Sequence, residues 1–162
     1  MGRTVLSLAA IGGLCGLLLV TTHYQTKGPI QINREAQARG LMTTMLGSPL
    51  PAEIDLTASF QGDCTTWVFH KTQAMGYAGN IELRTLWRPG GAMMMRVIAH
   101  RETPGIGDFI DHTRDPWILA LDSKRIDAIE QTDNVSGATI TTRAILRAAQ
   151  FSARNIEQFC DD

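Results

Sequence analysis

The sequence lacks the features that define several large classes of protein. Its 15 lysines and arginines are outnumbered by 16 acidic residues, so no basic excess supports nucleic-acid binding. Its three cysteines form no Cys-x-x-Cys pair and its four histidines show no ligand spacing. This argues against a metal or iron–sulfur centre built by this chain alone. Internal repeats and low-complexity tracts are missing, and no residue stands out as a general base or nucleophile.

Charge is absent from residues 4–22, and most of that segment is apolar. A helix of this length extends about 28 Å, close to the hydrocarbon thickness of a bilayer. The run is longer than the apolar region of a usual signal peptide, and no clear small-x-small cleavage site follows it. We therefore expect a transmembrane anchor over residues 1–23 and one domain over residues 24–162. Gly12 and Gly16 have the GxxxG spacing of packed membrane helices, although a plain anchor explains them equally well.

Basic residues flank the apolar segment on both sides, so the positive-inside rule does not orient it. Downstream, Gly28-Pro29 predicts a break, followed by an amphipathic helix over residues 30–45. Alternating patterns predict strands over residues 64–70, 80–87 and 92–100, with turns at residues 76–79 and 89–91. Residues 109–121 look helical or irregular and divided by Asp115-Pro116, and residues 126–130 suggest a short strand. The expected fold class is α+β, with an antiparallel sheet flanked by helices.

The last helix is predicted by apolar and small residues that recur every three to four positions from Ala138 to Phe159. Asp133 and Ser136 are both suited to cap its first turn. Thr139 then lies at or near the helix start, where free backbone N–H groups and the positive end of the dipole favour an anion. Gly137 and Ala138 leave room for a bulky group. A hydroxyl beside such a site suits a phosphate ester on Thr139, whereas the plain interpretation is an ordinary capped helix.

Two motifs in this order carry a family resemblance. The first is Asp-Asn-Val-Ser-Gly-Ala-Thr at residues 133–139, and the second is His-Arg-Glu-Thr-Pro-Gly-Ile-Gly at residues 100–107. Together they resemble the covalent-FMN domains of the RnfG/RsxG family, which are similar to the NqrC subunit of the sodium-pumping quinone reductase. In those families the first motif is the flavin attachment signal. The second is a further signature, with Ile106 where leucine is usual. The resemblance covers most of the chain.

The resemblance implies a small FMN-binding domain after one transmembrane helix, with one FMN joined through its phosphate to Thr139. The backbone around the phosphate is expected from Ser136, Gly137, Ala138 and Ile140. The flavin ring is expected to border Tyr77, His100, Glu102, Thr103, Pro104, Gly105 and Gly107. His100 is either a donor to the flavin or a structural histidine at the end of a strand. Members of the family are usually longer, with more residues between the parts that match Cys64 and Tyr77 and before the attachment motif.

The resemblance further implies an electron-carrying subunit of an Rnf-type ion-translocating ferredoxin:NAD oxidoreductase, without catalysis of its own. Expected partners are the other subunits of such a complex and a flavin transferase of the ApbE type. The expected location is the bacterial inner membrane, single-pass, with the domain on the periplasmic side. There, Cys64 and Cys160 would form a disulfide, as similar cysteines in the family suggest, or remain free thiols. Two alternatives are a flavin-binding sensor or regulator and an unflavinylated assembly subunit.

Overall fold

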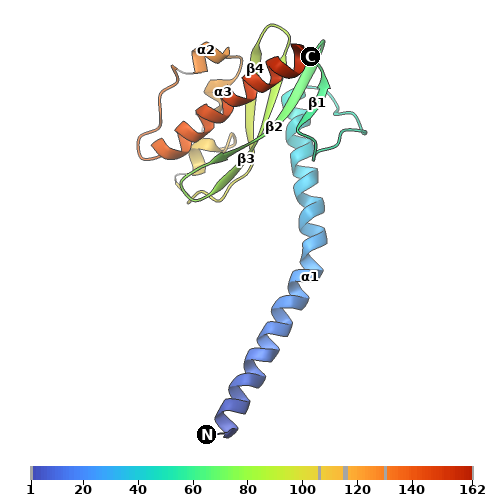
Figure 1. Cartoon of the computed structure of the whole chain (residues 1–162), viewed down its shortest axis with the longest axis vertical. Helices are drawn as coiled ribbons and strands as arrows, with labels where there is room; N and C mark the ends of the chain where they lie inside the picture. Colours follow the sequence, from blue (N-terminus) through green and yellow to red (C-terminus); the bar gives the residue numbers. More distant parts are fainter. Residues whose placement is uncertain (1, 106, 115–116, 130, 162) are drawn as a thin grey trace. The chain divides into compact units, whose positions relative to one another are not determined.

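The computed structural model describes residues 2–105, 107–114, 117–129 and 131–161. The chain divides into two compact units, residues 1–38 and residues 39–162, which are described separately. Figure 1 shows the helices and strands along the chain. In order these are α1 (Gly2–Leu46), β1 (Phe60–Asp63), β2 (Trp67–Met75), β3 (Asn80–Arg88), β4 (Ala92–Ala99), the 3-10 helices η1 (Gly107–Ile110) and η2 (Ile118–Leu121), α2 (Ile126–Ile129) and α3 (Thr139–Asp161).

Helix α1 contains the apolar N-terminal segment and is long and apolar enough to cross a membrane. It runs from Gly2 to Leu46 without ending at Pro29. The predicted break at Gly28-Pro29 is therefore wrong. A proline inside a helix removes one backbone hydrogen bond and crowds the preceding turn, which favours a bend but does not require the helix to end.

The four strands form one antiparallel sheet in the order β1-β2-β3-β4. The predicted strand over residues 80–87 and its partner over residues 92–100 are confirmed as β3 and β4. The predicted strand over residues 64–70 is wrong at its start, because Cys64 lies in the turn between β1 and β2. In that turn the Asp63 carboxylate accepts a hydrogen bond from the Thr65 N–H at 2.7 Å. Such a bond replaces ladder pairing with a tight turn.

The segment between the sheet and α3 differs from its predicted form. Residues 126–129 are the short helix α2 and not a strand, and Glu130 lies outside the described residues. Pairing with the sheet occurs slightly earlier, where Lys124 forms an isolated antiparallel bridge with Met93. Residues 107–121 contain the two short 3-10 helices, while Asp115-Pro116 also lies outside the described residues.

Each face of the sheet is covered by apolar side chains. On one face, α3 packs with Ile145 and Ala149 over Ile81 and Leu83 in the larger cluster. The predicted spacing of α3 is confirmed, since its buried residues recur at every third or fourth position. On the other face, the last turns of α1 and the segment after it cover Phe69 and Leu86. The predicted α+β class is therefore confirmed.

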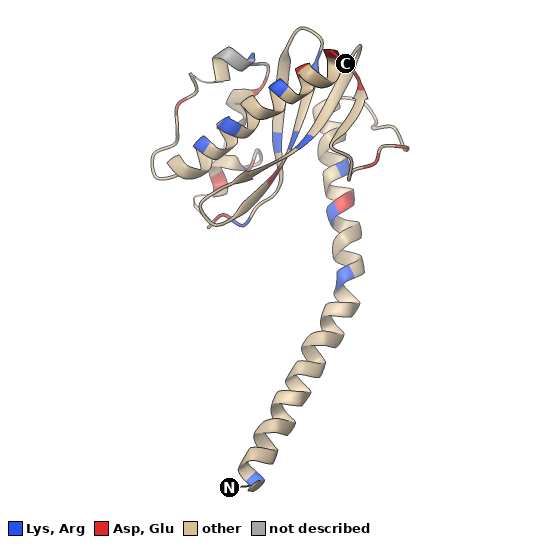
Figure 2. Cartoon of the chain, viewed as in Figure 1, with Lys and Arg blue, Asp and Glu red and all other residues tan. Residues whose placement is uncertain are grey.

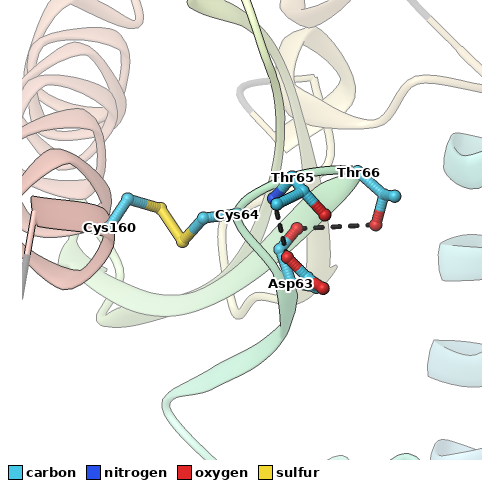
Figure 3. The surroundings of a disulfide bond; sticks show 5 residues. All are labelled: Asp63, Cys64, Thr65, Thr66 and Cys160. Atoms are coloured by element: carbon cyan, nitrogen blue, oxygen red, sulfur yellow. Dashed lines mark hydrogen bonds between the residues drawn. A yellow bond between two sulfur atoms is a disulfide. The ribbon is translucent and has the colours of Figure 1, made fainter.

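The end of α3 is joined to the β1–β2 turn. Cys64 and Cys160 form a disulfide with Cα atoms 5.6 Å apart (Figure 3). Beside it, the Phe60 ring stacks on Phe159 at 4.6 Å and on His70 at 4.4 Å, measured between ring centroids. The disulfide and the Phe60–Phe159 ring contact thus hold the helix against the first strands, and the Phe60–His70 contact joins β1 to β2.

The burial of His70 should make the free energy of unfolding depend on pH. Its ring is buried, and its Nδ1 lies 2.6 Å from the Ser152 Oγ. Burial, together with the positive charge of the nearby Arg84, lowers the pKa of His70 to about 4. The unfolded chain binds a proton near pH 6.5 that the folded chain binds only near pH 4, so stability falls as the pH is lowered through this window. We expect a loss of about 2 kcal/mol between pH 7.5 and pH 5.

The measurement is urea unfolding of the full chain in detergent at several pH values, followed by tryptophan fluorescence. His70→Gln should flatten the profile between pH 7.5 and pH 5, because it removes the proton-binding group. An unchanged slope in this variant would assign the acid sensitivity to other groups.

Candidate functional site

The site is built at the start of α3, where Thr139 is the first helical residue. The Thr142 N–H donates to the Ala138 carbonyl at 2.9 Å, so Ala138 occupies the capping position. Alanine has no side-chain oxygen to offer the first turn. The predicted caps, Asp133 and Ser136, lie further upstream, and that prediction is wrong. As in any α-helix, the first N–H groups of α3 have no intrahelical partner, and Ala138 supplies no side-chain acceptor for them.

The loop before the helix is fixed on both sides. The Ala138 N–H donates to the Val135 carbonyl at 3.1 Å, and Gly137 has φ 83°, which fits the third position of a type II turn. The Thr142 hydroxyl donates to the Asn134 side-chain oxygen at 3.1 Å. The Trp117 indole N–H donates to the Asp133 carbonyl at 3.0 Å. The turn therefore presents its backbone in one defined conformation.

A pocket of about 420 Å³ opens at this turn, a size in the usual range for cofactor sites. Two of its lining residues are largely exposed, with Tyr77 65% and Ile140 58% accessible. Thr139 and the first turn of α3, whose free N–H groups favour an anion, also belong to the lining. These features fit a phosphate that carries a flat aromatic group, as FMN does. The lining residues are Tyr77, Gly137, Ala138, Thr139, Ile140 and Thr141.

Glu102 connects this helix start to the β2–β3 hairpin. Its carboxylate is buried, and it accepts hydrogen bonds from the Ala78 N–H at 3.1 Å and from the Thr141 hydroxyl at 3.0 Å. Gly76 packs against the same carboxylate so closely that an added Cβ would clash with its oxygen. Glu102 thereby positions both sides of the pocket, the hairpin that carries Tyr77 and the helix turn that carries Thr139.

None of the described residues of the second motif, 100–105 and 107, is among the lining residues of the pocket. His100 is exposed, and its Nδ1 accepts the Glu102 N–H at 3.2 Å. Gly107 is packed beside His100 and donates its N–H to the Thr103 carbonyl at 2.8 Å. Thr103, Pro104 and Gly105 are exposed, and Ile106 lies outside the described residues. Among the residues predicted to border a flavin ring, Tyr77 lines the pocket. Glu102 does not line it, but it bonds Ala78 and Thr141, and Thr141 is one of the lining residues.

One of the four predicted phosphate-site residues differs in its placement. Gly137, Ala138 and Ile140 line the pocket, but Ser136 is exposed in the turn and outside the lining. Sequence analysis missed Thr141, which both lines the pocket and bonds Glu102. The available signal was a second hydroxyl two residues after Thr139, on the helix face that the spacing predicted to be buried.

Removing the Glu102 carboxylate should destabilise the domain. Glu102→Ala leaves the Ala78 N–H and the Thr141 hydroxyl without their acceptor. We expect a loss of about 2–4 kcal/mol, since the Thr141 bond is buried and the Ala78 bond is partly buried. Urea unfolding followed by tryptophan fluorescence measures it. The matched control is Glu82→Ala, because Glu82 forms a half-exposed ion pair with Lys71 at 3.4 Å and should cost less than about 1 kcal/mol. Equal losses in both variants would contradict the buried role of Glu102.

Comparison with known proteins agrees with a cofactor site at this pocket. A family model described as an FMN-binding domain matches residues 76–154, which include the β2–β3 turn, β3, β4, the residues that line the pocket and most of α3. The RnfG subunit of the ion-translocating oxidoreductase complex of Pseudomonas aeruginosa is 26% identical over 185 positions, covering 93% of this chain and 85% of that protein. Its counterpart in Haemophilus influenzae is 28% identical, covering 90% and 85%. The counterpart in Pseudoalteromonas atlantica is 32% identical, covering 92% and 84%.

The fold and the pocket define an FMN-binding domain that follows an apolar N-terminal helix. The relatives at this identity and coverage narrow the class further. The chain belongs to the RnfG family, whose members are subunits of ion-translocating oxidoreductase complexes. The alignment of 185 positions exceeds the 162 residues of this chain, so the Pseudomonas relative has internal residues without a counterpart here.

Proposed function

We propose that this chain carries one FMN, attached through its phosphate to the hydroxyl of Thr139. The observation that carries the proposal is the position of Thr139, which lines the pocket and is the first residue of α3. The residue before it, Ala138, has no side-chain oxygen to cap the helix. Free N–H groups at a helix start stabilise a phosphate. The conformation of Gly137 lets the chain turn sharply beside it.

The remaining lining supports a flavin ring. Tyr77 and Ile140 offer exposed apolar surface in the lining of the pocket, against which a flat aromatic group can pack. Glu102 bonds Ala78, next to Tyr77, and Thr141, next to Ile140, and so holds the two chain segments together. When bound, FMN supplies one- and two-electron redox chemistry, and the protein supplies its position and its electrostatic environment.

We infer that the chain acts as an electron carrier in an Rnf-type complex that couples electron transfer between ferredoxin and NAD to ion transport. The relatives are named as subunits of ion-translocating oxidoreductase complexes, which supports other subunits of such a complex as partners. The apolar part of α1 supports a single-pass anchor in the bacterial inner membrane. The domain would lie on the periplasmic side, and a flavin transferase of the ApbE type would load Thr139.

The test is the intact mass of the full chain produced with and without such a transferase. The proposal expects an increase by one FMN minus one water in the first preparation only, with the label mapped to the peptide that contains Thr139. An unchanged mass in the presence of an active transferase would favour the unflavinylated assembly subunit. A labelled chain that does not co-purify with other membrane redox subunits would favour the sensor or regulator.

A further inference from the structure

Strand β2 extends beyond the strand that borders it. β1 pairs only with residues 67–70 of β2, and one more bond joins the Lys71 N–H to the Ser59 carbonyl at 2.8 Å. Among the described residues, no strand pairs with the edge that continues to Met75. Peptide groups alternate sides along a strand. Since the Lys71 N–H faces β1, the N–H and carbonyl groups of Gln73 and Met75 face the same open side.

A groove of about 310 Å³ follows this open edge, between β2 and α3. Two large apolar side chains are exposed beside it, Met75 at 71% and Phe151 at 53%. An exposed strand edge with apolar neighbours is a template for pairing with another strand. The groove is lined by Gln73, Ala74, Met75, Ala144, Arg147, Ala148 and Phe151.

The charge around the groove is positive. Arg143 and Arg147 are exposed on α3, and the ion pairs among the described residues include neither of them. Figure 2 shows basic residues at intervals along α3. A second copy of this chain, paired through the same edge, would bring like charges together. A partner with carboxylates would instead find its complement here.

We propose that the open edge of β2 at residues 73–75 binds an extended segment of another protein by strand addition. The backbone of Gln73 and Met75 pairs with the segment, which gives it its extended form. Side chains alternate between the two faces of a strand, so apolar side chains of the segment pack against Phe151 on the α3 face and against Met75 on the opposite face, and a carboxylate pairs with Arg147. The site is separate from the Thr139 pocket, and its occupation does not depend on flavin loading.

The test places a photo-crosslinking amino acid at Met75 of the full chain in native membranes. We expect a cross-link to one segment of a different protein, which peptide mass spectrometry should show to combine apolar residues with aspartate or glutamate. The same probe at Gln158, which is exposed near the end of α3, serves as the control for nonspecific reaction.

Three second-site variants, one of them a control, test the mode of binding. Gln73→Pro removes an N–H that faces outward and so leaves the β2–β3 ladder intact, whereas Gln73→Ala keeps it. We expect at least a tenfold lower cross-link yield with Gln73→Pro and with Arg147→Glu, and an unchanged yield with Gln73→Ala. The flavin content should stay unchanged in all three variants, which separates this proposal from that of flavin attachment.

A second measurement covers the case in which Gln73→Pro disturbs folding. Amide hydrogen exchange at Gln73 and Met75 should be at least tenfold slower in the membrane complex than in the purified full chain. Equal exchange rates would overturn the proposal. So would a cross-link to a second copy of this chain, no cross-link beyond the Gln158 control, or a yield that Arg147→Glu leaves unchanged.

Discussion

Replacing Thr139 with valine should abolish covalent flavin while the domain stays folded. Valine has nearly the shape of threonine but no hydroxyl, so the phosphoester cannot form. Thr139 is only partly buried at the first residue of α3, and we expect a change in unfolding free energy below about 1 kcal/mol. The measurement is the intact mass after production with the flavin transferase, together with flavin fluorescence of acid-precipitated protein.

Thr139→Ser is the matched control, because it keeps the hydroxyl at the same place on the helix. It should retain covalent flavin, although at a level that depends on the transferase. Flavin that remains covalently bound to the valine variant would place the attachment at another residue. Loss of flavin together with loss of the tryptophan fluorescence transition would show that the variant is unfolded.

Removing the disulfide should have the largest effect on stability. Cys64 and Cys160 are separated by 96 positions, and opening so long a loop restores much conformational entropy to the unfolded chain. We expect Cys160→Ser to cost about 3–5 kcal/mol in oxidised protein. This corresponds to a melting temperature lower by about 10–20 °C for a domain of this size.

The measurement is thermal unfolding of the full chain in detergent, with and without reductant. Reductant should lower the melting temperature of the natural chain and leave that of Cys160→Ser unchanged. Cys15→Ser is the control, since Cys15 is a free cysteine on α1. If reductant leaves the natural chain unaffected and its mass unchanged, the two thiols are free in solution.

The sequence patterns correctly predicted the β3–β4 hairpin and α3, because both elements depend on residues that are close together in the chain. The alternation in residues 80–87 and the glycines after Pro89 predicted the β3–β4 hairpin, because a tight turn and its flanking strands depend on adjacent residues. The spacing of small and apolar residues predicted the buried face of α3 in the same way. The attachment motif also pointed to a helix start at Thr139 before any tertiary contact was known.

The predictions that were wrong also have physical reasons. Residues 64–66 have strand-like side chains, yet the Asp63 carboxylate bonds the following backbone and turns the chain. Residues 126–129 have apolar residues at a spacing that fits both a short strand and one helical turn. Asp133 and Ser136 are good caps by residue type, but the turn at Gly137 places Ala138 at the capping position.

The sequence alone determined the apolar helix, the hairpin, the amphipathic α3 and the hydroxyl at its first residue, because each depends on neighbours a few positions apart. Only the tertiary structure placed Glu102 between the hairpin and the helix, joined Cys64 to Cys160 and left the edge of β2 open beyond Lys71. These features depend on strand register and on the packing of distant segments. Such contacts are decided by the whole chain, since no short stretch of it contains both partners.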